Sequence, residues 1–165
     1  MATALKQLTI TLGLLASDPS ALGPKLGLAD YVWNVRQLGP CATDRSFPCL
    51  LLSSKWDWKR PQAYSVFIVP SQSPRALNLK VKLENEDRSD NDLVCMVLIA
   101  VSKDGRPAGG LFLSYEVLSQ HRLQDDVVLP IEKGHKVVRL EIGSKQCDET
   151  RAQDEKAASR VLTGR

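Results

Sequence analysis

The sequence predicts an all-β, mainly antiparallel domain, either a β-sandwich or a jelly-roll-like barrel of about eight to nine strands. About nine short apolar or alternating segments are separated by turn residues along the chain. Strand and helix patterns do not alternate in the way that builds parallel sheets. Residues 93–101 are apolar without a break, which is typical of a strand buried on both faces. This run is too short for a membrane-spanning helix, and a buried helix segment is the alternative.

The first part of the chain contains two expected strands separated by a loop. In residues 8–12, leucine and isoleucine alternate with threonine, which is the pattern of a half-buried strand. Residues 18–30 hold two prolines and two glycines and are expected to form a loop. Tyr31, Trp33 and Val35 then fall on one side of a second extended segment, which therefore has an aromatic face.

The middle of the chain predicts a hairpin followed by an amphipathic strand. Residues 49–53 and 64–69 have the apolar, β-branched and aromatic composition of strands, and residues 55–61 form an extended tip between them. Residues 77–84 alternate between apolar and polar side chains, so one face is expected on the core and the other toward solvent or a partner. Residues 84–92 hold five acidic side chains against one arginine and are expected to form a solvated loop.

The remaining strands follow the apolar run. Glycines and a proline in residues 104–110 predict a turn into a strand at 111–117. Residues 118–126 are ambiguous and fit either a loop or a short helical turn. Strands at 127–131 and 136–142 close the domain.

We expect a single β domain over residues 1–143 and a polar C-terminal tail over residues 144–165. The tail has few apolar residues before Val161 and mixes both charge signs. Asp148 could cap a short helix through Arg160, because the intervening residues are good helix formers. Such a helix has no clear apolar stripe, so the tail is expected to be helical or disordered, with disorder favoured unless a partner orders it.

The four cysteines do not form a metal-binding pattern. They contain no Cys-x-x-Cys pair and have no paired histidine at zinc-finger spacing. Cys95 lies inside the apolar run and is expected to be a free thiol that behaves as a small apolar side chain. Cys41 and Cys49 flank a short loop and are expected to form a disulfide only if the chain is exported.

The N-terminal residues bear on export. Residues 1–17 have one lysine, an apolar stretch and then small residues, which is a weak outline of a secretory signal. Thr9, Thr11 and Gly13 interrupt the apolar part, and the chain has no N-glycosylation sequon. A cytoplasmic location is therefore expected, with secretion as the alternative.

No catalytic apparatus is recognisable. His121 and His135 are the only histidines, and neither lies in a signature of nucleophilic catalysis. The glycine-rich residues 105–110 lack the Gly-Lys-Ser/Thr ending of a phosphate-binding loop. We therefore expect no catalytic residue, metal site, cofactor or small-molecule substrate; a hydrolase built on His121 is the enzymatic alternative.

The strongest candidate for a binding site is the hairpin tip. In an extended tip, Trp56 and Trp58 share one face and lysine and arginine side chains flank them. Aromatic side chains beside cations stack on bases, anchor at lipid headgroups or form protein-interface hot spots. The expected contact residues are Lys55, Trp56, Trp58, Lys59 and Arg60, together with Lys80 and Lys82 on the polar face of the amphipathic strand. The alternative is that one tryptophan belongs to the core and the cations only solvate the hairpin.

These features predict a non-enzymatic structural or interaction protein that self-associates or binds a macromolecular partner, of the kind found as a viral coat or matrix subunit. That comparison is at the level of the fold alone. The expected partner is a second copy in a homo-oligomer, with RNA or an anionic membrane surface as alternatives. The net charge is only +3, and neither end of the chain is the strongly basic arm of an RNA-packaging coat.

Two other functions are kept as alternatives. One is a single-stranded nucleic-acid-binding accessory protein, of the movement or silencing-suppressor type, in which Lys80, Lys82 and the hairpin tip form one groove. The other is a secreted, disulfide-bonded binding module.

Overall fold

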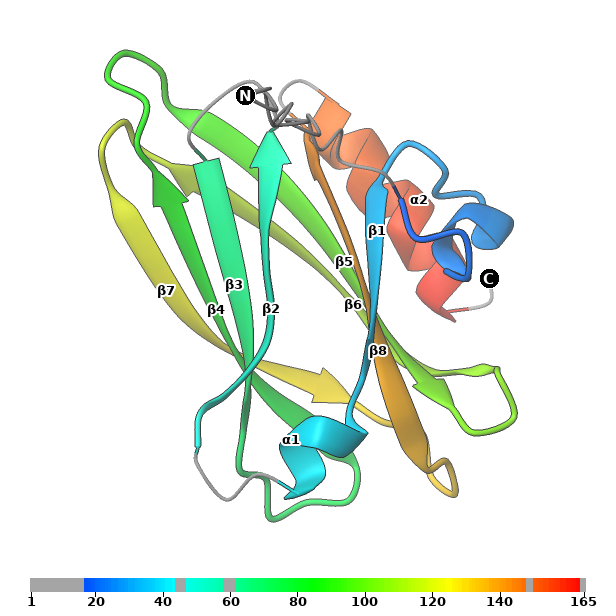
Figure 1. Cartoon of the computed structure of the whole chain (residues 1–165). Coiled ribbons are helices and arrows are strands. Elements are labelled where there is room, and N and C mark those ends of the chain that lie inside the picture. Colours follow the sequence, from blue (N-terminus) through cyan, green and yellow to red (C-terminus); the bar gives the residue numbers. More distant parts are fainter. Residues whose placement is uncertain (1–16, 44–46, 58–61, 148–149, 164–165) are drawn as a thin grey trace, which may run out of the picture.

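Two antiparallel sheets pack face to face in the computed structural model, which describes residues 17–43, 47–57, 62–147 and 150–163 (Figure 1). The elements in chain order are η1 (Gly23–Leu26), β1 (Val32–Gln37), α1 (Gly39–Thr43), β2 (Cys49–Asp57), β3 (Gln62–Val69), β4 (Ala76–Asn85), β5 (Asp92–Ser102), β6 (Pro107–Val117), β7 (Arg122–Pro130), β8 (Val137–Gln146) and α2 (Arg151–Thr163).

Each sheet has four strands. Sheet A has the order β1-β8-β5-β6 and sheet B the order β2-β3-β4-β7. All neighbouring strands are antiparallel. The expected all-β antiparallel sandwich is therefore confirmed, with eight strands among the described residues. The strand expected at residues 8–12 lies outside the described part of the chain.

The apolar run is a central strand, β5, because it pairs with β6 on one side and β8 on the other. Its side chains alternate between two cores. Met96 and Leu98 face the interior between the sheets, whereas Cys95 and Val97 belong to a second apolar cluster on the outer side of sheet A. Burial on both faces explains why the sequence shows no polar alternation here.

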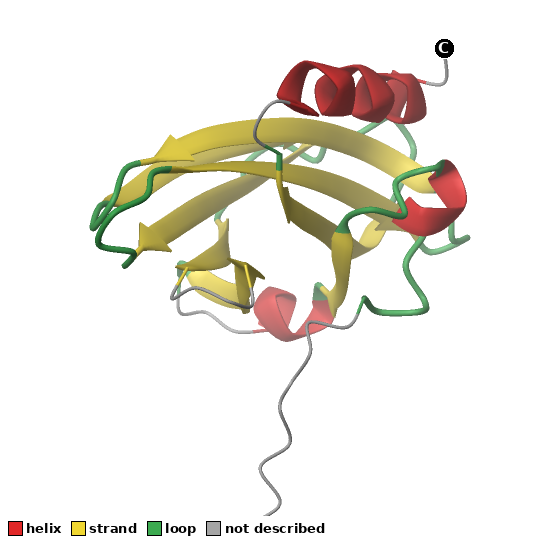
Figure 2. Cartoon of the chain, turned by 90° about the horizontal axis from the view of Figure 1, so that it is seen from above, coloured by secondary structure: helices red, strands yellow, loops and turns green. Residues whose placement is uncertain are grey.

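The second cluster exists because helices and a loop cover sheet A. α2 contacts β6 and β5, and Figure 2 shows it lying across the outer face of this sheet. Tyr31 and Trp33 are buried in the same cluster, so the aromatic face expected for β1 is present and faces away from sheet B.

Close packing of α2 depends on a glycine in β6. A Cβ atom on Gly110 would lie 2.0 Å from Cδ2 of Leu162, so a larger residue would push the helix away. Here the structure differs from the expected turn over residues 104–110. β6 begins at Pro107, and Gly109 and Gly110 serve close packing within the strand.

The C-terminal segment is part of the sandwich. β8 continues to Gln146, so the boundary expected at residue 143 falls inside a strand. α2 supplies the helix that was one of two expectations for the tail, and it buries Asp154 and Ala158 against sheet A. Its expected cap, Asp148, lies outside the described residues. The ambiguous residues 118–126 contribute the first half of β7.

None of the helices in the described residues is both long enough and apolar enough to cross a membrane.

Candidate functional site

The outer face of sheet B carries the lysines expected to contact a partner. Lys55 on β2 and Lys82 on β4 are exposed, and Lys80 on β4 is half-buried. The alternation of β4 that turns Leu79, Val81 and Leu83 into the core turns Lys80 and Lys82 outward.

Trp56 is not on this face, and the structure corrects the expectation that it is an exposed contact. β2 continues through this position, so Trp56 points inward and is only 5% exposed. Its indole N–H donates a hydrogen bond of 3.2 Å to the buried Asp92 carboxylate. Trp56 is thus the core tryptophan of the alternative interpretation. Trp58, Lys59 and Arg60 lie outside the described residues.

The register of sheet B sets the chemistry of its outer face. Phe67, Lys80 and Asp126 stand side by side on three adjacent strands, and the Lys80 ammonium lies 2.9 Å from the Asp126 carboxylate. Arg122 and Glu84 form a second ion pair of 3.3 Å across β7 and β4.

Lys82 has a different environment. Its Nζ atom lies 5.1 Å from the centre of the Phe67 ring, and no carboxylate in the described part of the chain forms an ion pair with it. A hollow of about 260 Å³ between β4 and β7 is lined by Lys82, Arg122 and Gln124, among others. Free positive charge therefore lies next to an aromatic ring and a shallow recess.

Apolar side chains complete this surface. Leu50 on β2 is 54% exposed and Val128 on β7 is 61% exposed. No described helix lies across this face: α1 sits at one end of the sandwich, where the Cys41–Cys49 disulfide joins it to the start of β2 (Figures 1 and 2). We call the surface formed by Leu50, Lys55, Phe67, Lys80, Lys82, Glu84, Arg122, Gln124, Asp126 and Val128 the open face.

The histidines form no catalytic group among the described residues. The exposed His121 has its Nδ1 atom 2.6 Å from the backbone oxygen of Ser119. His135 lies 3.8 Å from the Glu132 carboxylate. All four cysteines are in disulfides, so none is present as a thiol nucleophile.

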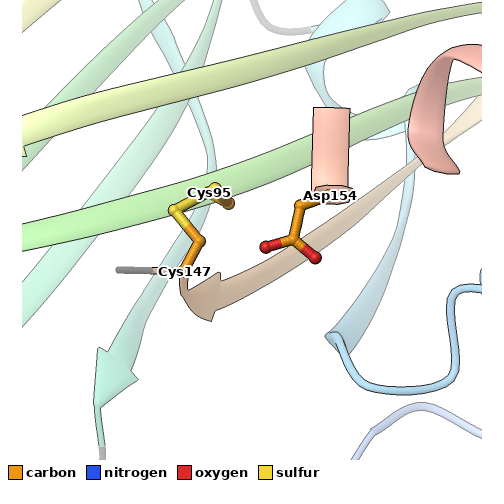
Figure 3. Close-up of side chains that lie close together, drawn as sticks. All are labelled: Cys95, Cys147 and Asp154. Carbon is orange, nitrogen blue, oxygen red and sulfur yellow. A yellow bond between two sulfur atoms is a disulfide. The ribbon is translucent and has the colours of Figure 1, made fainter. Parts of the chain in front are cut away.

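The second disulfide was not anticipated and corrects the expectation of a free thiol at Cys95. Cys95 on β5 and Cys147 after β8 are bonded across adjacent strands of sheet A (Figure 3). Proximity could not be deduced from one sequence, because Cys147 lies in the segment that resembles a tail. The even number of cysteines was the available signal.

A charged cluster lies beside this disulfide under α2. The Lys145 ammonium contacts the Asp154 carboxylate at 2.6 Å and also the Asp30 carboxylate. Its Nζ atom lies 5.0 Å from the centre of the Tyr31 ring. Burial acts to lower the pKa of Lys145, but hydrogen bonds to the Asp154 and Asp30 carboxylates outweigh it and raise the pKa above its usual value.

This cluster brings together atom types that can bind a metal, but these atoms already have bonding partners within the protein. The sulfur atoms of Cys95 and Cys147 and a carboxylate oxygen of Asp154 lie within 4.8 Å of one another (Figure 3). The sulfur atoms are bonded together, and Asp154 accepts hydrogen bonds from Lys145 and Thr150. The arrangement therefore anchors α2 to sheet A rather than offering a set of metal ligands.

Comparisons with known proteins do not assign a family. No protein-family model matches the chain, and no curated protein matches it. Among solved structures, a DUF1425 family member from Shewanella sp. pv-4 is similar over 61% of this chain and 92% of its own, with 11% identity and a TM-score of 0.37. The enzymatically active domain of tailspike protein 4 from bacteriophage CBA120 is similar over 79% of this chain and 19% of its own, with 12% identity and a TM-score of 0.25. Neither likeness is close enough to bear on function.

Proposed function

We propose that this protein is a non-enzymatic, disulfide-stabilised binding module that contacts a protein partner of acidic surface through the open face. The observation that carries the proposal is the contrast between the two outer sheet faces. Sheet A is covered by α2, whereas the open face presents exposed apolar side chains beside Lys55 and Lys82, neither of which forms an ion pair with a described residue. Exposed apolar area with a polar rim is typical of interaction sites.

The charge pattern favours a protein over a nucleic acid. Asp126 and Glu84 stand among the lysines and pair with Lys80 and Arg122, so the face alternates in sign instead of forming a uniformly basic track. Stacking on bases also requires exposed aromatic rings. The burial of Trp56 removes one of the two rings on which the nucleic-acid alternative depends.

The two disulfides support an exported protein over a cytoplasmic one. Both cysteine pairs are bonded, and such bonds persist in oxidising compartments but are rare in the cytosol. We therefore propose the secreted binding module in place of the cytoplasmic structural protein. Mass spectrometry of alkylated protein made in its own host is the test. Four alkylated cysteines would contradict an exported location, and the absence of any alkylated cysteine would support it.

Light scattering on the purified protein addresses the partner class. We expect a monomer at low and high salt that does not change mass with a mixed-sequence single-stranded RNA. A salt-resistant oligomer would favour self-association instead. A complex formed only with RNA at low salt would favour the nucleic-acid-binding alternative.

Site-specific photo-crosslinking in the host then tests the face itself. A crosslinking residue at position 82 should yield one discrete adduct, and the same residue at the exposed position 156 on α2 should not. The captured protein, once purified, should bind the wild type and lose affinity for Lys82→Glu. Equal adducts at both positions, or unchanged binding by Lys82→Glu, would contradict the proposal.

A further inference from the structure

A row of three adjoining hollows, which we call the groove, runs along the end of the sandwich next to α1. Its first part is a pocket of about 260 Å³ with a mainly apolar lining that includes Leu38, Ile68 and Val137. The second part, of about 480 Å³, shares Leu77 and Val137 with the first. The two hollows therefore adjoin between sheet B and the start of β8, and together we call them the apolar trough.

The other end of this trough is basic. A third hollow, of about 390 Å³, shares His135 and Lys136 with the second and is also lined by Lys103 and Lys133. These three lysines are exposed, and none forms an ion pair within the described residues. Asp104 in the same hollow forms an ion pair with Arg106 and accepts a hydrogen bond from the Ser102 hydroxyl. The groove is therefore apolar at one end and positively charged at the other.

Backbone hydrogen bonds hold the walls of the groove in place. The Leu38 N–H donates to Val138 (2.9 Å), the Ile131 N–H to Arg75 (2.8 Å) and the Lys103 N–H to Lys136 (3.3 Å). The Cys41–Cys49 disulfide fixes α1 at the apolar end. The groove is thus preformed, as small-molecule sites usually are, and its hollows approach or reach the usual range of about 300–1,000 Å³.

We propose that this groove binds a fatty acid of medium to long chain from solution, with the carboxylate at Lys103, Lys133 and Lys136 and the acyl chain in the apolar trough. Charge complementarity selects an anionic head group, because the three lysines line one hollow next to the trough and none of them is in an ion pair with a described residue. The shape selects a single chain, because the trough is a recess between two turns and α1. A bilayer surface would meet the lysines but would not place a chain in this recess.

Titration calorimetry with dodecanoate below its aggregation concentration tests the proposal. We expect saturable one-to-one binding and no binding of dodecyltrimethylammonium, which has the same chain and the opposite charge. Affinity should rise from decanoate to tetradecanoate by up to about fifteenfold for each two buried methylenes. Equal binding of the cationic amphiphile, or no dependence on chain length, would overturn the proposal.

Two pairs of matched variants locate the site. Ser71 is exposed and lines both apolar hollows, whereas Gln72 is exposed next to it and lines neither. Ser71→Trp should block dodecanoate binding and Gln72→Trp should preserve it, with equal thermal unfolding showing that both variants fold. Binding that survives Ser71→Trp would place the ligand elsewhere.

The head-group contact is tested in the same way. Replacing Lys103, Lys133 and Lys136 together by Gln should weaken dodecanoate binding at least about tenfold, because charge-assisted hydrogen bonds are lost. Replacing Lys55 and Lys82 of the open face by Gln should leave it unchanged, which separates this site from the protein-binding face. The proposal is wrong if the wild type does not bind dodecanoate but binds anionic phosphatidylglycerol vesicles, and the three-lysine variant loses that vesicle binding. The groove region would then be a membrane-surface site.

Discussion

The two sheets differ in what lies on their outer faces, and this difference organises the molecule. Sheet A is covered by α2, which is attached through Lys145 and packs over the Cys95–Cys147 disulfide. No helix of the described residues covers sheet B, which exposes Leu50 and Val128. An apolar face that is sealed contributes to stability, whereas one left open is available to a partner. Changes at sheet A should therefore affect folding, and changes on the open face should affect binding.

The largest effect is expected from removing the disulfide of sheet A. Cys95 and Cys147 are 52 residues apart, so the bond limits the unfolded chain strongly, and replacing both by Ala should cost about 4 kcal/mol in the chain-entropy description. Replacing Cys41 and Cys49, which are 8 residues apart, should cost about 2.5 kcal/mol. Urea unfolding measures both. A larger loss for the Cys41–Cys49 pair would contradict this ranking of the two regions.

A smaller effect is expected from separating α2 from sheet A. Gly110→Val places side-chain atoms where Leu162 lies, and such overpacking should cost about 1–3 kcal/mol of unfolding free energy. Leu162→Ala in the same chain should recover part of the loss, because it vacates the space. A double-mutant cycle measures this coupling; purely additive costs would show that the contact is not responsible.

High pH should weaken the interior between the sheets. Burial and a hydrogen bond to Asp125 at 2.9 Å raise the pKa of Tyr115 above its usual value of 10.0. The pKa of Tyr115 is higher in the folded than in the unfolded protein. The contribution of its protonated hydroxyl to the free energy of unfolding is therefore complete below about pH 10 and is lost as the pH rises through the folded pKa. The urea midpoint should fall between about pH 9 and about pH 11, and less steeply in Tyr115→Phe. Equal slopes for the two proteins would exclude Tyr115 as a source.

The smallest effect on stability is expected on the open face. Lys82 is exposed and has no carboxylate partner among the described residues, so Lys82→Glu should change the unfolding free energy by no more than about 0.5 kcal/mol. The same substitution is expected to abolish capture of the acidic partner. A destabilised Lys82→Glu variant would show that this face is structural.

Much of the fold could be predicted because hydrophobic periodicity is local. The unbroken run of β5 and the alternation of β4 follow directly from which faces are buried. The site was harder to predict, since Trp56 and Lys55 are neighbours in the sequence and their exposure depends on where β2 ends. Extension of that strand through position 56 buries the tryptophan and leaves the lysine outside.

The sequence by itself determined the antiparallel all-β class, the central strand and the outward position of Lys80 and Lys82, because each depends on a short-range pattern. Only the tertiary structure decided that Cys95 pairs with Cys147, that α2 covers sheet A and that an apolar groove leads to Lys136. These features join segments far apart in the chain. Contacts of this kind depend on strand order and register, which no single segment encodes.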